Sequence, residues 1–321
     1  MRSSAIEHEL RITNEATAYA PSHRYRRPAL AWLAILLALT PACRTLSRQG
    51  PVPRSVATCR QLSQQGRSAL ERGEWERAES LFSRALEACP LDTDARRQYA
   101  EALWHRGAGR EAVGQLIEAW KLDAHDPSLA VRAGEMYLAM GNLPQARQAA
   151  DQALQLDSKL ASAWALRGSI SLSAGELREA LTDYQRALGY APNHQPVLLN
   201  LAETYRRLGQ PERALTALEN LIDTYPPGEA PQQALLLEGM ALAQLDRSRE
   251  AVESYSLATQ RGAPTAELWY RLGEAELRCG RQRQATLAAE NALALDPEHK
   301  PSQALLGRIE VAYQPATRTI R

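Results

Sequence analysis

The side chains best suited to chemistry are thinly spread along this sequence. No two histidines form an i, i+4 pair, and none lies near a cysteine at the spacing of a metal site. The six histidines are His8, His23, His105, His125, His194 and His299. Carboxylates recur one at a time rather than as close pairs, for example at Glu101, Glu135, Glu203 and Glu274. No nucleophile-elbow, phosphate-loop or dinucleotide-binding motif occurs. We therefore expect no enzymatic activity, no cofactor and no metal ion.

One cysteine, Cys43, ends a segment that has the order of an export signal. Arg26 and Arg27 precede eleven uninterrupted apolar residues at 29–39, and small residues then lead to Cys43. This apolar core is shorter than the roughly 20 residues that cross a bilayer. The segment resembles a bacterial lipoprotein signal, which implies that Cys43 becomes the lipid-modified first residue of the mature chain. Thr40 departs from that pattern, since such signals favour leucine there.

Three locations for the protein are open at this stage. It is an exported lipoprotein anchored in the bacterial cell envelope through Cys43, a protein held by an uncleaved membrane anchor, or a cytoplasmic protein. The fifteen residues after Cys43 are polar and contain proline and glycine, which is the composition of a flexible tether. A tether next to a lipid site favours the first location.

Charge and composition bear on the partner and on the fold class. Lysine and arginine number 38 against 37 aspartates and glutamates, with no basic block, so nucleic acid is not an expected partner. Apolar residues make up 45% of the chain, but alternating β-branched runs are absent. The composition therefore favours an all-α protein.

Alanine recurs in register along most of the chain. The spacing is 34 residues at every step except one of 37, at Ala78, Ala112, Ala146, Ala180, Ala214, Ala251 and Ala285. Glycine stands five residues before each alanine except in the sixth unit, which has Asp246. Glycine or alanine stands twelve residues before each, at Gly66, Ala100, Gly134, Gly168, Ala202, Gly239 and Gly273. The units begin at Cys59, Thr93, Pro127, Ala161, Gln195, Gln232 and Ala266 and are numbered one to seven below.

Each unit has the features of a helical hairpin. Two amphipathic windows of about a dozen residues flank the turn glycine, which suits the left-handed conformation at the end of a helix. Small residues at the crossing points let the two helices approach closely. Four units then close with a proline that cannot continue the helix, at Pro90, Pro192, Pro226 and Pro297. One such hairpin buries its apolar face only when the next one stacks on it.

The period and these residues resemble the tetratricopeptide repeat family. Unit four matches the family's order best, with Trp164, Gly168, Ala180, Tyr184, Ala187 and Pro192. The resemblance implies a right-handed superhelical array of seven helical hairpins and a C-terminal capping helix. The expected segments are a signal or anchor at 1–42, a tether at 43–58, units one to five at 59–228, an insertion at 229–231, units six and seven at 232–299, the capping helix at 300–314 and a tail at 315–321. Three prolines in 225–232 predict a local break in the array between units five and six.

The resemblance also implies a function and a binding face. Members are protein-interaction scaffolds whose first helices line a concave groove that holds a protein or peptide. Carried onto this chain, the groove positions in units one to three are Arg60, Arg67, Arg97, Glu101, Trp104, Arg132 and Glu135. In units four, six and seven they are Ala165, Leu166, Leu172, Leu236, Leu237, Met240, Tyr270, Arg271 and Glu274. We expect a charged N-terminal end and an apolar continuation, with Trp104 and Tyr270 as anchors, unless tight curvature buries these side chains against one another.

A soluble cytoplasmic adaptor or co-chaperone is the alternative function. Co-chaperones of this family grip a C-terminal carboxylate with lysines and asparagines. Here Asn200 is the only asparagine at a groove position and no lysine occupies one, which disfavours that clamp.

Two cysteines of unit one stand where its helices meet. Cys59 opens the first helix and Cys89 closes the second, and antiparallel packing brings those ends together. An exported protein is oxidised, so the pair forms either a disulfide or two separate buried thiols. Cys279 has no candidate partner.

Overall fold

The computed structural model describes residues 54–313, and the regular structure in this range is entirely helical. Fifteen helices follow one another, joined by short turns except for a longer loop at 223–231. They are α2 (Arg54–Glu71), α3 (Trp75–Ala88), α4 (Thr93–His105), α5 (Gly109–Leu122), α6 (Pro127–Ala139), α7 (Leu143–Leu156), α8 (Ala161–Ser173), α9 (Leu177–Tyr190), α10 (Gln195–Arg207), α11 (Pro211–Ile222), α12 (Gln232–Gln244), α13 (Ser248–Thr259), α14 (Ala266–Arg278), α15 (Gln282–Leu295) and α16 (Lys300–Tyr313).

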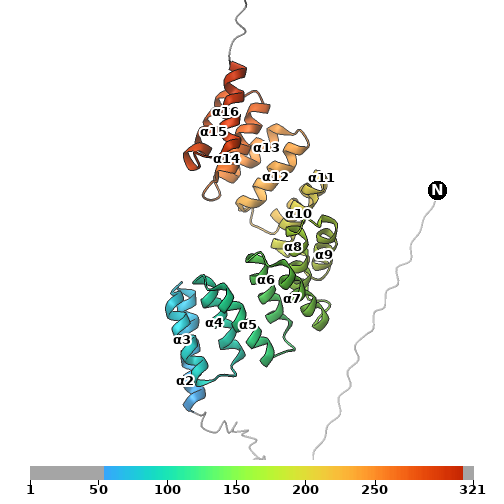
Figure 1. Cartoon of the computed structure of the whole chain (residues 1–321). Coiled ribbons are helices and arrows are strands. Elements are labelled where there is room, and N and C mark those ends of the chain that lie inside the picture. The colour runs from blue at the N-terminus through green and yellow to red at the C-terminus, as the bar shows by residue number, and fades with distance from the viewer. Residues whose placement is uncertain (1–53, 314–321) are drawn as a thin grey trace, which may run out of the picture. The chain divides into compact units, whose positions relative to one another are not determined.

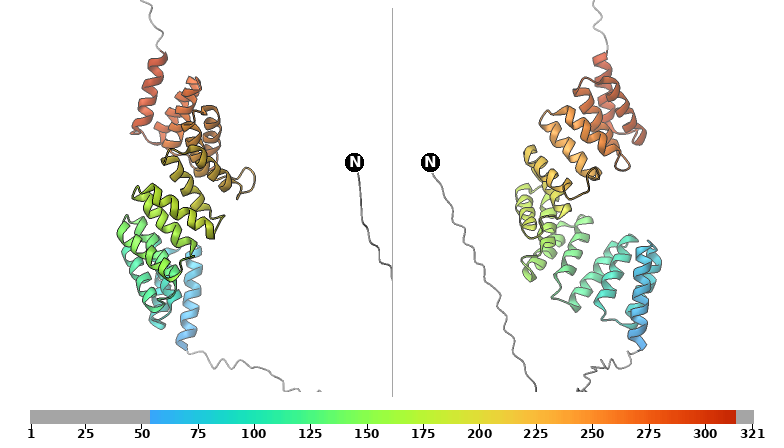
Figure 2. Two further views of the ribbon diagram at one scale, coloured as in Figure 1. Left: turned by 90° about the vertical axis from the view of Figure 1, so that its right-hand side faces the viewer. Right: turned by 180° about the vertical axis from the view of Figure 1, so that it is seen from behind.

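The helices pair two by two along the chain. Helix α2 packs chiefly on α3, α4 on α5 and so on to α14 on α15, and each pair then packs on the next (Figure 1). Figure 2 shows the same succession of hairpins from two further sides. The predicted all-α array of stacked hairpins is confirmed.

The turn inside each hairpin uses the left-handed backbone that the glycine column predicts. Six of these glycines have φ between 71° and 89°, and they are Gly73, Gly107, Gly141, Gly175, Gly209 and Gly280. Asp246 stands in the same column and adopts φ 58°. Aspartate is among the few residues other than glycine that tolerate this region, so unit six keeps the same turn without glycine.

The column of small residues marks the closest approach of the paired helices. A Cβ atom added to Gly168 would lie 2.7 Å from the ring of Tyr184. At Gly239 it would lie 2.5 Å from the ring of Tyr255. Both rings are fully buried, so each glycine makes room for an aromatic side chain of the second helix.

The packing continues through the loop between α11 and α12. One core cluster contains Leu221 of α11 together with Ala234 and Leu237 of α12. Ala230, within the loop itself, is buried in the next cluster. The prolines therefore interrupt the helix but leave the apolar faces of units five and six in contact. The local break in the superhelix stays a prediction.

The N-terminal helix is longer than the repeat pattern predicts. Helix α2 begins at Arg54, so residues 54–58 are helical rather than part of the tether. Val56 is partly buried, and the Cys89 thiol lies 3.8 Å from the carbonyl oxygen of Ser55. This extra turn therefore packs against the end of α3. Residues 1–53, with Cys43, and residues 314–321 lie outside the described part of the chain.

The C-terminal helix α16 covers the last hairpin. Leu305 and Ile309 are buried in a cluster with Ala285 and Ala289 of α15. Val311 remains 73% exposed. Helix α16 thus buries one side against α15 and leaves the other to solvent, which is the arrangement expected of a capping helix. Among the residues from 54 to 313, no helix combines the length and the apolar character needed to cross a membrane.

Candidate binding surfaces

The first helices of units two to four form a hollow of about 480 Å³. We call it the first-helix groove, and its lining consists of Arg97, Gln98, Glu101, Ser128, Val131, Arg132, Glu135 and Ser162. These side chains come from α4, α6 and α8. On each of α4 and α6 they are three or four residues apart, so they lie on one side of the helix. The structure thus brings together four of the predicted groove residues: Arg97, Glu101, Arg132 and Glu135.

The charges in the first-helix groove largely compensate one another. Arg132 donates two hydrogen bonds of 2.7 Å to the carboxylate of Glu101 in the preceding unit. It also donates one of 2.8 Å to Glu135, one turn further along α6. The bonds to Glu101 are the main reason that the pKa of Arg132 is raised above its usual value. Arg132 is therefore a fixed cation that joins two units.

Arg97 is the more available cation of this groove. Among residues 54–313 its one ion pair, at 3.1 Å, is with Asp94 on the same helix, whose side chain is 80% exposed. An exposed pair of this kind contributes little to stability, typically below about 1 kcal/mol. A carboxylate of a bound peptide could therefore replace Asp94 as the partner of Arg97 at small cost.

Trp104 lies elsewhere. It lines a different hollow with Gly109, Arg110 and Met140, at the turns of units two and three. A Cβ atom on Gly109 would meet both the Trp104 ring and the Met140 sulfur at 3.2 Å. Trp104 thus lines a hollow of its own, two helical turns along α4 from Arg97.

The apolar continuation of the groove is partly core. Leu166 and Leu237 are only 4% and 8% exposed, so their prediction as open groove residues is wrong. The reason for Leu166 lies in the preceding unit: a Cβ atom on Gly134 would be 2.6 Å from Leu166 Cδ2. The missing side chain admits Leu166 to the core. Partial burial describes the other members, which are Ala165, Leu172, Leu236 and Met240.

The C-terminal groove positions belong to a polar network. Arg271 donates a 2.6 Å hydrogen bond to Glu267, which also lies 3.4 Å from His299. The Tyr270 ring meets the His299 ring edge to face at 5.7 Å. Glu274 lies 3.7 Å from Arg308 on α16. These residues thus connect α14 to α16 and to His299, which directly precedes it. At the other end of the array, Arg60 and Arg67 on α2 are exposed.

The two thiols of unit one lie side by side. Cys59 is buried and Cys89 partly buried, and both are thiols in the structure. The Cys59 sulfur is 3.3 Å from a carboxylate oxygen of Asp92. Burial, followed by the hydrogen bonds with Cys89 and Asp92, raises the pKa of Cys59 to about 12. The disulfide remains a prediction, and counting free thiols in the denatured protein with and without reductant tests it.

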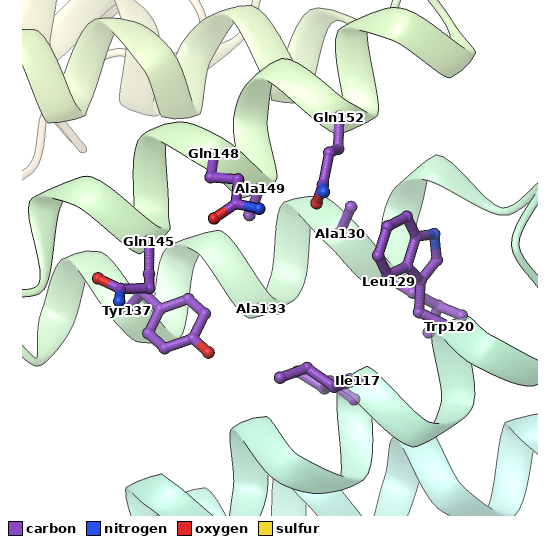
Figure 3. A pocket seen from close by; sticks show the side chains of 11 residues that line it. Ile117, Trp120, Leu129, Ala130, Ala133, Tyr137, Gln145, Gln148, Ala149 and Gln152 are labelled. Carbon is purple, nitrogen blue, oxygen red and sulfur yellow. The ribbon is translucent and has the colours of Figure 1, made fainter.

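A second hollow lies on the other side of α6 and was missed at the level of sequence. It has a volume of about 190 Å³ and lies between α5, α6 and α7 (Figure 3). We call it the α5–α7 pocket, and its lining consists of Leu116, Ile117, Trp120, Leu129, Ala130, Ala133, Tyr137, Gln145, Gln148, Ala149 and Gln152. The signal that could have found its neutral lining is a pair of alanines, Ala133 and Ala149, at positions where every other unit has at least one larger side chain.

Residues 54–313 contain no group of three His, Cys, Asp or Glu side chains placed to hold a metal ion. Most ion pairs in this range join an arginine to a carboxylate, as around Arg132.

Comparison with protein families gives a consistent result. Models described as tetratricopeptide repeat match residues 63–127, 131–195, 171–238 and 266–299. Among curated proteins, the BBSome complex member BBS4 of Bos taurus is 25% identical over 193 residues, covering 60% of this chain and 36% of that protein. DnaJ homolog subfamily C member 7 of Homo sapiens is 23% identical over 265 residues, covering 78% and 50%. The chain therefore spans half or less of the length of these relatives.

Solved structures show the same fold. A tetratricopeptide repeat protein from Parabacteroides merdae superposes with a TM-score of 0.60 at 16% identity, covering 79% of this chain and 99% of that one. The Cut9–Hcn1 structure gives 0.66 at 14% identity, covering 76% and 48%. YrrB, described as a protein of the same repeat type with an unusual peptide-binding site, gives 0.50 at 20% identity, covering 60% and 97%.

Proposed function

This chain belongs to the tetratricopeptide repeat family, and on that premise we propose that it is a membrane-tethered scaffold that binds a protein or peptide in the first-helix groove. Proteins of this family are generally interaction scaffolds rather than enzymes. The observation that supports the groove is the gathering of Arg97, Arg132 and their neighbours from three successive hairpins around one hollow. A partner lying there crosses several units, so its register is read by more than one helix.

The groove favours an extended peptide with an acidic side chain. Arg97 is 40% exposed and has only an exposed intrahelical partner. Ser128, Ser162 and Gln98 line the same hollow and supply hydroxyl and amide groups for a peptide backbone. Because the apolar positions further along are partly core, we assign recognition to hydrogen bonds and charge in units two to four, without an apolar stretch.

The membrane tether rests on the sequence of the N-terminal segment. Eleven apolar residues after arginines, small residues and then Cys43 are the order of a lipoprotein signal. A single lipid chain anchors weakly, so stable attachment requires two or more chains on Cys43. Mass spectrometry of the mature N-terminus tests this: we expect a diacylated or triacylated Cys43, and an unmodified chain starting at Met1 would overturn the tether.

A cytoplasmic co-chaperone is the second candidate, favoured by similarity to DnaJ homolog subfamily C member 7 and to Hsp70-Hsp90 organizing proteins. Asn200 argues against a carboxylate clamp of that kind, because its amide donates to Ser169 Oγ at 3.4 Å. Cell fractionation separates the candidates: a chain released only by detergent supports the tether, and a chain in the cytosol supports the co-chaperone.

The groove itself is tested by reversing one charge. The full chain captures proteins from an envelope extract, in parallel with Arg97→Glu and with the matched control Arg84→Glu on α3. Arg84 is exposed and lies outside the groove. We expect a partner that binds the wild type and the control alike and binds Arg97→Glu at least about tenfold more weakly, the effect of losing one charged hydrogen bond. Equal binding to all three proteins would reject the groove.

A further inference from the structure

The α5–α7 pocket is an opening with apolar walls and amides at its mouth. Its walls include the Trp120 ring, Ile117 and the two alanines Ala133 and Ala149. The glutamines of α7 extend toward the hollow from one side in Figure 3, and Tyr137 does so from α6. No charged residue contributes to this lining. A charged ligand would therefore lose its hydration in this pocket without gaining a counter-ion, and the chemistry favours a neutral occupant.

The pocket differs from its equivalent in the next unit through two small, neutral side chains. Between α7, α8 and α9 a hollow of about 380 Å³ has a charged lining that includes Arg147, Asp151, Arg167, Glu179, Asp183 and Arg186. Ala133 and Ala149 are the seventh and twenty-third residues of unit three. In unit four the same positions hold Arg167 and Asp183, joined by hydrogen bonds of 2.9 and 2.8 Å. In the remaining units these pairs are Gln65 with Leu81, Tyr99 with Gln115, Leu201 with Ala217, Glu238 with Ser254, and Leu272 with Ala288. Unit three alone has a small residue at both positions.

The volume of the pocket limits what enters it. At about 190 Å³ the pocket is smaller than the roughly 300–1,000 Å³ of sites for drug-sized molecules. An apolar cavity of about 150 Å³ engineered in another protein holds one benzene molecule. The space thus suits one aromatic ring or one branched aliphatic side chain. The rest of a larger ligand must remain outside the pocket.

The mouth suits the backbone that carries such a side chain. Gln145, Gln148 and Gln152 lie along one side of α7, at spacings of three and four residues. Each amide offers two donors and one acceptor, which complement the carbonyl and N–H groups of an extended polypeptide. A free apolar molecule would leave these amides unused.

We propose that the α5–α7 pocket is a second binding site, which takes one uncharged aromatic or branched aliphatic side chain of a partner polypeptide while the glutamines of α7 bind the flanking backbone. Arg132 and Glu135 of the first-helix groove lie on the opposite side of α6 from Ala133 and Tyr137, as their helical spacing requires. The two sites are therefore separate, and this proposal does not depend on the first-helix groove.

The test uses capped amino acids as the probes. The full-length chain is titrated with N-acetyl-L-phenylalaninamide, N-acetyl-L-leucinamide and the corresponding aspartate derivative, while NMR follows the side-chain N–H signals of Trp120, Gln148 and Gln152. We expect saturable shifts with the first two probes at millimolar affinity, as suits so few contact atoms, and none with aspartate. Absence of any saturable shift with all three probes would overturn the proposal.

A substitution that closes the pocket supplies the specific control. Ala133→Leu gives unit three the leucine–alanine pair already present in units five and seven, so the fold has precedent for it. Ala139→Leu adds the same atoms at an exposed position of the same helix outside the lining. We expect Ala133→Leu to weaken binding of the phenylalanine probe at least tenfold and Ala139→Leu to leave it unchanged. Equal binding to both variants would overturn the assignment, and toluene binding more tightly than the capped phenylalanine would overturn the polypeptide occupant.

Discussion

Units three and four hold opposite solutions at the same two positions. In unit three Ala133 and Ala149 line a neutral hollow, whereas in unit four Arg167 and Asp183 line the equivalent hollow with an ion pair. The Asp183 side chain is only 7% exposed, and Arg167 also lies 4.4 Å from the centre of the Trp164 ring. The arginine is thus held by charge and by packing together.

The difference shows which positions carry the fold. Both units keep the turn glycine, the closely approaching glycine and the buried alanine that define the hairpin. The seventh and twenty-third positions are free to be empty, charged or apolar, because each hairpin closes its core with the other columns. In a stacked array such local choices leave distant units unaffected, so the chemistry of each unit can be changed separately.

The largest expected effect comes from breaking the ion pair of unit four. Arg167→Ala leaves the Asp183 carboxylate buried without its cation, which costs about 3–5 kcal/mol for a buried pair. Urea unfolding followed by circular dichroism measures the loss. The double variant Arg167→Ala/Asp183→Ala reproduces the alanine pair of unit three and should recover most of it. Arg147→Ala is the matched control, since its pair with Glu176 is over 40% exposed on both sides and is worth below about 1 kcal/mol. A double variant no more stable than Arg167→Ala would contradict the comparison.

The next largest effect comes from removing the buried leucine at the seventh position of unit five. Leu201 occupies the seventh position of unit five opposite Ala217, is 7% exposed and belongs to the largest core cluster. Leu201→Ala removes buried carbon atoms and gives unit five alanine at both positions, as in unit three. We expect a loss of about 2–4 kcal/mol in the free energy of unfolding. Thermal unfolding measures it, with Leu257→Ala at a 47% exposed site as the control. A loss as small as that of the control would mean that the surrounding helices collapse into the space.

A structural feature can be predicted from the sequence more readily when it depends on one hairpin than when it depends on several helices. The hairpins follow from a column within one unit: Ala180, Gly168 and Gly175 have fixed spacings that the chain itself imposes. Asp246 keeps its turn because the backbone conformation is a local property. Leu166 was misjudged because its burial depends on Gly134 in another unit. The α5–α7 pocket needs two alanines on different helices, and a pattern within either helix does not reveal it.

Trp104 and the start of α2 are two further features that the repeat pattern alone does not predict. Trp104 holds one of the family's groove positions, and its ring lies against Gly109, where a Cβ atom would be 3.2 Å from it. The start of α2 at Arg54 lies before the first repeat position, where the periodicity has no preceding unit to define it. Site residues are therefore harder to predict than hairpins, since each depends on which neighbour is small.

A smaller effect comes from the polar solution of unit six. Ser254 Oγ donates a 2.8 Å hydrogen bond to Glu238, and Ser254 is 6% exposed. Ser254→Ala removes one hydrogen bond to a charged group that keeps partial access to water, so we expect a loss of about 1 kcal/mol. Thr182→Ala serves as the control, because that exposed hydroxyl bonds only within its own helix. Urea unfolding compares the two variants, and a loss above about 3 kcal/mol for Ser254→Ala would show that Glu238 depends on it as Asp183 depends on Arg167.

The smallest expected effect is a gain in stability, and it comes from placing a larger side chain in the α5–α7 pocket. Ala133→Leu adds three carbon atoms to a pocket whose walls already contain Ile117 and Trp120, and each buried CH₂ contributes roughly 0.8 kcal/mol. Loss of side-chain freedom, about 0.5–1 kcal/mol for leucine, and the open mouth of the pocket offset most of this gain. We therefore expect a stabilisation below about 1 kcal/mol, visible as a slightly higher thermal midpoint than that of Ala139→Leu. A binding site kept open at the expense of stability predicts this sign, because residues that serve binding need not be the most stabilising ones at their positions. Destabilisation by more than about 1 kcal/mol would mean that the walls cannot accept a side chain, and would remove the basis for reading the pocket as a vacant side-chain position.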